Sequence, residues 1–365
     1  MRKKLLYAFL IFITLLLIIN PQDSVKYARG GLGMAGEIIV PSLFPFFICS
    51  GLLIYSGFCE IPAKLMQPVM KPLFNVNGAG AAAFVLGIIS GYPLGALTAC
   101  RLYEKSYLSK SEAERMLAFC NNSGPLFILG AVGISLYQNP KVGTILYISH
   151  IISAVLTGFI FKFYKKNEYN APRSRIQTEA GSIGEIFSTV LINSVQSILT
   201  VCGAVIFFSV VSSLITDLLP LTPWIKIFVT GLLEFVTGVK LIAYSNMPLY
   251  EKLVLSAAIV GFAGVSVHVQ VLGVVSKYGL SLKPYIIGKS IQGVLAAALT
   301  MLILRLFPVE KTVFAPLSVE VGGAFAMDSL FVIITVVSVF FIVLAGMIFG
   351  IFKKMYRVKK EYGKI

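Results

Sequence analysis

Residues 87–133 decide the fold, and they read GIISGYPLGALTACRLYEKSYLSKSEAERMLAFCNNSGPLFILGAVG. Two apolar segments lie here, and helix-breaking residues interrupt them at 90–95 and at 121–125. In a bilayer core an unpaired backbone group is costly, so such a break persists only inside protein or beside a water-filled cavity. One break would be compatible with a proline kink in an ordinary packed helix. Two breaks this close together, both with polar side chains, predict the binding site of a membrane transporter.

The composition is that of a multi-pass helical membrane protein. Of the 365 residues, 57% are hydrophobic and 13% are charged, and the mean hydropathy is +0.87. Soluble proteins average about a quarter charged residues, whereas several runs here approach or exceed the ~20 apolar residues that cross a bilayer core. The net charge of +15 comes mainly from Lys and Arg between apolar segments, where they orient the chain and contact anionic lipid. We therefore expect lipid contacts and no nucleic-acid partner.

The apolar segments predict a single membrane domain. The run from Leu5 to Ile19 follows three basic residues, and no small-residue cleavage site follows it, so we interpret it as an uncleaved span with a cytoplasmic N-terminus. The remaining segments are 37–58, 78–102, 116–137, 141–161, 186–217, 224–246, 253–276, 284–306 and 328–352. The expected organisation is an N-terminal span and connector (1–36), a first repeat (37–165), a basic cytoplasmic linker (166–185), a second repeat (186–306), and a C-terminal span with a basic tail (307–365).

The distribution of basic residues favours two re-entrant hairpins, at 78–102 and at 224–246. If both segments crossed the membrane, the basic loop 162–185 would face outside. If both dip in and return, 22 of the 31 Lys and Arg residues face the cytoplasm, as the positive-inside rule requires. This arrangement places both termini in the cytoplasm and gives each half three crossings plus one hairpin. Full spans at these two segments are the alternative.

The two halves resemble each other along the chain. Residues 42–55 align with 194–207, and Gly124 in the first half falls opposite Gly264 in the second. Because each half has an odd number of crossings, the second becomes an upside-down copy of the first, the inverted-repeat plan of secondary transporters. One hairpin then enters from each face of the membrane, and the two tips can meet near the midplane.

Four segments carry a family resemblance: PSLFPFFICSGLL, GIISGYPLGALTA, FCNNSGPLFILGAVG and GFAGVSVHVQ. Together they resemble the YlbJ-type sporulation integral membrane proteins, which carry the nucleoside-recognition Gate domain, over residues 37–305. The resemblance implies an all-α fold similar to concentrative nucleoside transporters, with two hairpins and two broken helices around a central site. It also implies work in endospore formation, in the mother-cell-derived outer forespore membrane. The substrate it suggests is dipicolinic acid, a planar pyridine dicarboxylate, although Gate domains also occur in proteins with other substrates.

The first half offers the groups that a small planar dianion needs. The two breaks would create half-helix N-termini, whose unpaired backbone N–H groups favour anions, and glycines there permit close backbone approach. Tyr92 can stack on an aromatic ring, or it can lie at the membrane interface. The substrate-binding candidates of this half are Ser90, Gly91, Tyr92, Gly95, Asn121, Asn122, Ser123 and Gly124.

The second half adds four candidates. Glu234 and Lys240 lie within an apolar segment, where charges are costly and mark functional sites. Lys240 is a candidate for binding a substrate carboxylate, and Glu234 for binding a coupling H⁺ or Na⁺; a structural pair of the two, or snorkelling near a hairpin mouth, is the alternative. His268 and Gln270 can both reach the cavity if their segment is unwound. The alternative for His268 is a buried neutral ring bonded to a carbonyl.

The sequence motifs do not indicate an enzyme. The chain has no P-loop, HExxH or GxSxG motif, only two histidines, and five cysteines without C-x-x-C spacing. We therefore expect no catalytic residue, metal site or cofactor, and any active transport must use an ion or substrate gradient.

The predicted function is secondary transport of a small anionic metabolite, with dipicolinic acid suggested by the resemblance. The expected partners are this substrate, the lipid bilayer, a coupling H⁺ or Na⁺, and either a second copy of the chain or other sporulation membrane proteins. Two alternatives stay open: a nucleoside transporter of the same fold, and a non-transporting membrane scaffold needed for sporulation. A scaffold would have no use for polar breaks at the midplane.

Overall fold

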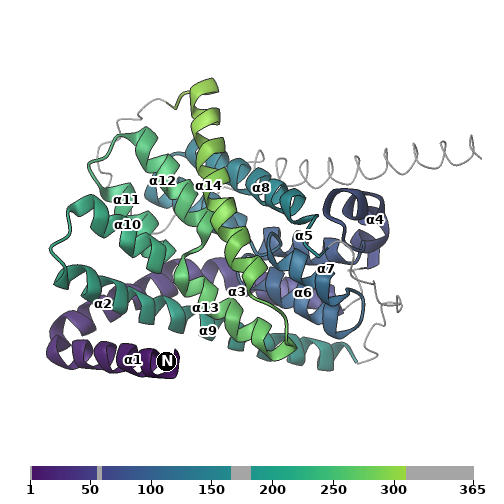
Figure 1. Cartoon of the computed structure of the whole chain (residues 1–365), viewed down its shortest axis with the longest axis horizontal. Coiled ribbons are helices and arrows are strands. Elements are labelled where there is room, and N and C mark those ends of the chain that lie inside the picture. The colour runs from purple at the N-terminus through teal and green to yellow at the C-terminus, as the bar shows by residue number, and fades with distance from the viewer. Residues whose placement is uncertain (1, 56–59, 166–181, 310–365) are drawn as a thin grey trace, which may run out of the picture.

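The protein is a bundle of helices (Figure 1). The computed structural model describes residues 2–55, 60–165 and 182–309, and every regular element in these ranges is helical. The elements before residue 166 are α1 (Arg2–Ile19), α2 (Pro21–Met34), η1 (Ala35–Ile39), α3 (Val40–Tyr55), α4 (Glu60–Phe74), α5 (Gly80–Ser90), α6 (Leu94–Glu104), α7 (Lys110–Leu117), η2 (Leu126–Leu136) and α8 (Pro140–Phe161). The elements after residue 181 are α9 (Ile183–Leu218), α10 (Pro223–Leu233), α11 (Phe235–Tyr244), α12 (Leu249–Phe262), α13 (Gly264–Val275), η3 (Ser276–Tyr278) and α14 (Lys283–Leu306).

Four elements in the described ranges are long and apolar enough to cross a membrane. They are α8, α9, α14 and the stretch Leu249–Tyr278, which contains α12 and α13. These elements confirm the expectation of an all-α membrane protein with several spans. The segment expected at 116–137 is not among them, because its break leaves only the 11 residues of η2. The spans expected at Leu5–Ile19 and 37–58 are also not among them: α3 has 16 residues, and the apolar part of α1 found in the described residues is Leu10–Ile19. The expected span 328–352 and most of the linker 166–185 lie outside the described residues.

The first predicted hairpin region forms two short helices that fold back on each other. α5 ends at Ser90 and α6 begins at Leu94, and Gly91 between them has φ 85° and ψ −174°, a conformation that favours glycine strongly. A Cβ atom on Gly87 of α5 would lie 3.0 Å from the Cα of Gly95 on α6. The two arms therefore pack backbone against backbone, in the manner of a helical hairpin.

The second region does the same around Glu234. α10 ends at Leu233 and α11 begins at Phe235, while Glu234 is extended, with φ −139° and ψ 107°. A Cβ atom on Gly238 would clash with the backbone of Gly231, so these arms also fold back on each other. The sequence did not predict this turn point, because Glu234 is neither Gly nor Pro.

Both predicted broken helices are broken. After α7 the chain is unwound to Gly124, and η2 follows. Between α12 and α13 the break is sharper, because only Ala263 (φ 73°) and Gly264 (φ 67°) leave the helical conformation. The break at 121–125 lies where the sequence placed it, and the second break lies at Gly264, the residue that aligns with Gly124. The stretch that carries His268 and Gln270 is not unwound, because both residues lie within helix α13.

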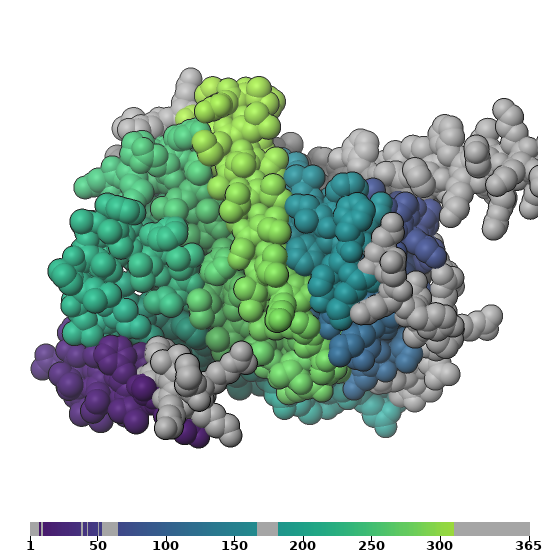
Figure 2. Space-filling model, in the orientation of Figure 1, coloured from purple at the N-terminus to yellow at the C-terminus, as the bar shows by residue number. Residues whose placement is uncertain are grey.

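Helix α14 holds the two halves together. In Figure 1 the first hairpin (α5 and α6) and the second (α10 and α11) lie on opposite sides of the bundle, with α12, α13 and α14 between them. Figure 2 shows α14 running across this face of the protein beside α8. Its contact with the first break is close, because a Cβ atom on Gly288 would lie 2.8 Å from the Cα of Ala118. The side chains of Lys289, the next residue, and of Gln292, one turn further along α14, reach the unwound residues Asn121 and Asn122.

Candidate functional site

Each hairpin tip lies directly against the broken helix of its own half. In the first half, a Cβ atom on Gly91 would lie 3.1 Å from the backbone nitrogen of Gly124. In the second half, a Cβ atom on Gly264 would lie 3.0 Å from the backbone nitrogen of Phe235. The four points where the helices are interrupted thus form two tip-to-break contacts of the same kind.

The two tips also meet each other through aromatic rings. The rings of Tyr92 and Phe235 are 5.7 Å apart, edge to face, and Phe127 of η2 lies 5.2 Å from Phe235. The Tyr92 hydroxyl donates a hydrogen bond of 3.0 Å to the carbonyl of Val260, near the end of α12. Tyr92 therefore joins the first tip to the second break, so that all four interruptions converge on one region.

A buried lysine lies at this convergence. Lys289 of α14 has no exposed surface, and its ammonium donates to the backbone carbonyl of Asn121 (3.1 Å) and to Oε1 of Gln292 (2.7 Å). The same ammonium lies 5.2 Å from the centre of the Tyr92 ring, within the range of a cation–π contact. Among the described residues it has no carboxylate partner. An ammonium has three N–H donors, and two of them make these hydrogen bonds, while the Tyr92 ring lies beside the charge.

The first break is held to α8 and α14 by a chain of hydrogen bonds. Gln292 donates to Oδ1 of Asn122 (2.9 Å), whose own amide donates to the carbonyl of Phe119 (2.8 Å). The backbone N–H of Ser123 donates to Nε2 of His150 on α8 (3.1 Å). These bonds satisfy groups that the unwound backbone would otherwise leave unpaired, so the break is a defined structure.

Near the second break, some buried polar atoms have no hydrogen-bond partner among the described residues. His268 packs between the rings of Phe262 and Tyr285, at 4.7 and 5.0 Å, and its Nδ1 is 2.7 Å from the carbonyl of Gly264. Within the described ranges, His268 Nε2 and Gln270 Oε1 are buried and have no hydrogen-bond partner. Ser90 Oγ at the first tip is in the same condition. Most buried polar groups in proteins are paired, so these atoms are available to a ligand.

A small cavity adjoins these groups. Its volume is about 30 Å³, and Tyr92, Ser123, Gly124, Phe235 and Gln270 are among its lining residues. This volume suits a few water molecules at most. The structure therefore shows the tips closed on each other, with no room yet for a metabolite.

The structure brings most of the predicted site residues together. The residues of the first tip and break are Ser90, Gly91, Tyr92, Gly95, Asn121, Asn122, Ser123 and Gly124, whereas His268 and Gln270 lie on α13, just after the second break. Lys240 lies apart from them, because its side chain is on the exposed surface of α11.

Glu234 is buried at the second tip and caps a helix. Its two carboxylate oxygens accept from the backbone N–H groups of Val236 (3.1 Å) and Thr237 (2.5 Å). A coupling ion at this carboxylate would have to compete with both bonds.

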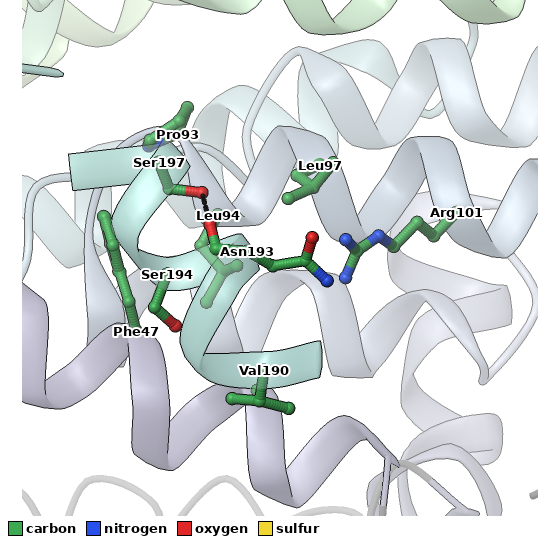
Figure 3. A pocket seen from close by; sticks show the side chains of 10 residues that line it. Phe47, Pro93, Leu94, Leu97, Arg101, Val190, Asn193, Ser194 and Ser197 are labelled. Atoms are coloured by element: carbon green, nitrogen blue, oxygen red, sulfur yellow. Dashed lines mark hydrogen bonds between the residues drawn. The ribbon is translucent and has the colours of Figure 1, made fainter. Parts of the chain in front are cut away.

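A second cavity, also of about 30 Å³, lies between α3, α6 and α9 (Figure 3). Arg101 and Asn193 face each other across it, and the Ser197 hydroxyl donates to the Asn193 carbonyl (2.7 Å). The cavity reaches Pro93 at the first tip. It therefore runs along the outer side of α6 from Arg101 toward the central site.

Comparison with known proteins fits this geometry. A family model for nucleoside recognition, called Gate, matches residues 38–159, which include the first tip and the first break. The sporulation integral membrane protein YlbJ of Bacillus subtilis (strain 168) is 32% identical over 82% of this chain and 82% of its own length. The chain belongs to the YlbJ family of sporulation integral membrane proteins. The resemblance seen in the sequence is confirmed, and so is the expectation of a multi-pass integral membrane protein. No solved structure matches the chain.

Sequence reasoning missed the residues that α14 contributes. Lys289 was visible as a charge inside an apolar segment, the signal that also selected Glu234 and Lys240. Its partner Asn121 is 168 residues away, and no spacing rule connects them. Gln292, one turn further on, gave no signal of its own.

Proposed function

We propose that this protein is a secondary transporter of a small anionic metabolite, with dipicolinic acid as the preferred candidate, across the outer forespore membrane during endospore formation. The proposal rests mainly on the position of Lys289, which is fully buried without a carboxylate partner among the described residues. It contacts the first break through Asn121 and the first tip through the Tyr92 ring, which in turn meets the second tip at Phe235. Membership of a sporulation membrane protein family supports the setting.

An anionic substrate explains the unpaired charge. Burying a charge without a counter-charge is expensive, whereas a carboxylate that binds beside the ammonium removes much of that cost. The tips and breaks add backbone N–H groups at the starts of α6, η2 and α13, which favour anions. We assign substrate contacts to Lys289, Ser90, His268 and Gln270, and close backbone approach to Gly91 and Gly124.

We infer that the two hairpins are re-entrant and that the two halves form an inverted repeat. Each arm has 10 or 11 residues, which is about 16 Å at ~1.5 Å per residue. A ~30 Å hydrocarbon core is about twice as thick, so each hairpin reaches the middle and returns. Cysteine labelling at Ser106 and Tyr250 tests this topology, because the inverted repeat places them on opposite sides. Labelling of both from the same side would contradict it.

The closed contact between the tips gives a mechanism of alternating access. The Tyr92 ring lies between the Lys289 ammonium and the Phe235 ring, and the cavity of about 30 Å³ that Tyr92 and Phe235 line is too small for a metabolite. One tip must therefore withdraw from the other before substrate can enter. Withdrawal of the first tip would open toward one face, and withdrawal of the second toward the other.

The test is uptake of radiolabelled dipicolinate into liposomes that contain the purified protein. We expect saturable uptake, and a loss of at least tenfold in Lys289→Met, which keeps the volume of the side chain and removes its charge. Asn122→Leu should also lose uptake, because it disconnects the first break from Gln292. Unchanged uptake in a folded Lys289→Met protein would contradict the site assignment.

The Gate match favours a second candidate function, transport of a nucleoside. Neutral ribose hydroxyls would bind the amides of Asn122 and Gln270 rather than need the charge of Lys289. Competition between uridine and dipicolinate separates the two proposals. Uptake of uridine that persists in Lys289→Met would favour the nucleoside.

A further inference from the structure

The contacts of Lys289 have the character of a cation site. The ammonium is bound by a main-chain carbonyl of an unwound segment (Asn121), by an amide oxygen (Gln292) and by the face of an aromatic ring (Tyr92). Carbonyl oxygens of broken helices coordinate coupling ions such as Na⁺ in secondary transporters. Aromatic faces also attract cations. All three groups are suited to a positive charge, and in this structure the charge is part of α14.

The lysine is held in this site by close packing. Gly288, its neighbour on α14, lies so close to Ala118 that a Cβ atom there would clash with the Ala118 backbone. Gln292 is fixed in turn, because its amide donates to Asn122 and, at 3.4 Å, to the carbonyl of His150. The ammonium therefore cannot leave without rearranging the first break, and a free ion cannot enter while it remains.

We propose that Lys289 is a tethered substitute for a coupling cation: its ammonium occupies the cation site of the first break, so that this protein binds no Na⁺ there and transports without it. The statement that the protein transports without Na⁺ rests on the proposed function, whereas the assignment of Lys289 to a cation site does not. In this protein the fixed charge of Lys289 would take the place of a bound Na⁺, so Na⁺ coupling at Glu234 is not needed. Transport would then be driven by the substrate gradient or by a proton gradient.

Thermal unfolding of the full chain in lipid nanodiscs tests the site without a transport assay. In the wild-type protein, NaCl and choline chloride at equal ionic strength should give the same melting temperature. Removal of the ammonium in Lys289→Ala should lower that temperature. n-Propylammonium, which replaces the deleted atoms from Cγ to Nζ, should then restore part of the loss.

Two controls separate charge from volume. 1-Propanol has the shape of n-propylammonium without its charge, and it should not restore stability. Lys289→Met fills the space, so n-propylammonium should not affect it. Equal rescue by 1-propanol and n-propylammonium would overturn the proposal. A Na⁺-specific rise in the melting temperature of the wild-type protein would also overturn it, and that measurement needs no variant to fold.

Dipicolinate uptake with Na⁺ or choline as the external cation tests whether transport needs Na⁺. Equal uptake in both supports it, and uptake that requires Na⁺ overturns it. An absence of uptake in both conditions would count against the proposed function. The melting experiments would still decide the cation site.

Discussion

In the first half the chain turns at Gly91 and unwinds over several residues before η2, whereas in the second half it turns at Glu234 and breaks only at Ala263 and Gly264. The first tip and break use residues with unusual backbone freedom, and side chains from α8 and α14 satisfy the exposed groups. The second tip uses one carboxylate to cap α11, and its break keeps a left-handed alanine. Both halves thus make the same contact between tip and break. The first half makes it with non-helical backbone, and the second makes it with a helix that Glu234 caps.

This difference indicates where each half contributes to function. In the first half, hydrogen bonds from His150 and Gln292 hold the break in place, and its tip turns at a glycine. Both halves keep buried atoms without a hydrogen-bond partner, such as Ser90 Oγ in the first and His268 Nε2 in the second, but only the second break has a strained residue, Ala263. Unpaired groups and strained residues cluster at functional sites in proteins. We therefore expect the second break to adjust when substrate binds.

The largest effect should come from the first tip. Gly91→Ala places a Cβ atom on a backbone with φ 85° and ψ −174°, a conformation essentially confined to glycine, and 3.1 Å from the nitrogen of Gly124. We expect a loss of about 1–3 kcal/mol in the free energy of unfolding. Unfolding by SDS in mixed micelles measures it. Gly130→Ala is the matched control, because a Cβ atom there meets nothing within 4 Å; equal losses in both would show that the tip is not strained by a side chain.

Substitution at the second tip should lower the free energy of unfolding less than substitution at Gly91. Glu234→Ala removes an N-cap, and we expect a loss of about 0.5–2 kcal/mol in the free energy of unfolding. Glu234→Gln should lose less, because one amide oxygen can still accept from Val236 or Thr237. The same titration measures both. A Glu234→Gln protein of wild-type stability that lacks uptake would instead assign this carboxylate to a coupling ion.

The second break should tolerate, and even benefit from, a glycine. Ala263 has φ 73° and ψ 2°, and the left-handed conformation costs a residue with a Cβ atom roughly 1–2 kcal/mol. Part of that gain is offset because glycine has more freedom in the unfolded chain. We therefore expect Ala263→Gly to raise the free energy of unfolding by about 1 kcal/mol. Ala257→Gly, in the regular part of α12, should lower it instead; a fall in both would mean that Ala263 is not strained.

The sequence predicted the features that local chemistry determines. Gly, Pro and Asn residues mark the breaks at 90–95 and 121–125, because they are poor helix formers. At Gly91 the backbone also has a positive φ of 85°, which favours glycine. The turn at Glu234 was missed since its cause is a side chain that caps the next helix, and a lone glutamate in an apolar run is more readily interpreted as a charge. Lys289 and Gln292 were missed for a different reason. Their roles come from packing of α14 against a break 168 and 170 residues away, which no local pattern encodes.

The smallest effect should come from the second lysine in the apolar segments of this half. Lys240 is exposed on α11, and Lys289 is fully buried on α14. We expect Lys240→Met to change the free energy of unfolding by less than about 0.5 kcal/mol and dipicolinate uptake by less than about twofold. Lys289→Met, the same substitution at the buried position, should lose at least tenfold in uptake. If Lys240→Met abolished uptake and Lys289→Met did not, the substrate would have to bind outside the convergence of tips and breaks, on the exposed side of the second hairpin.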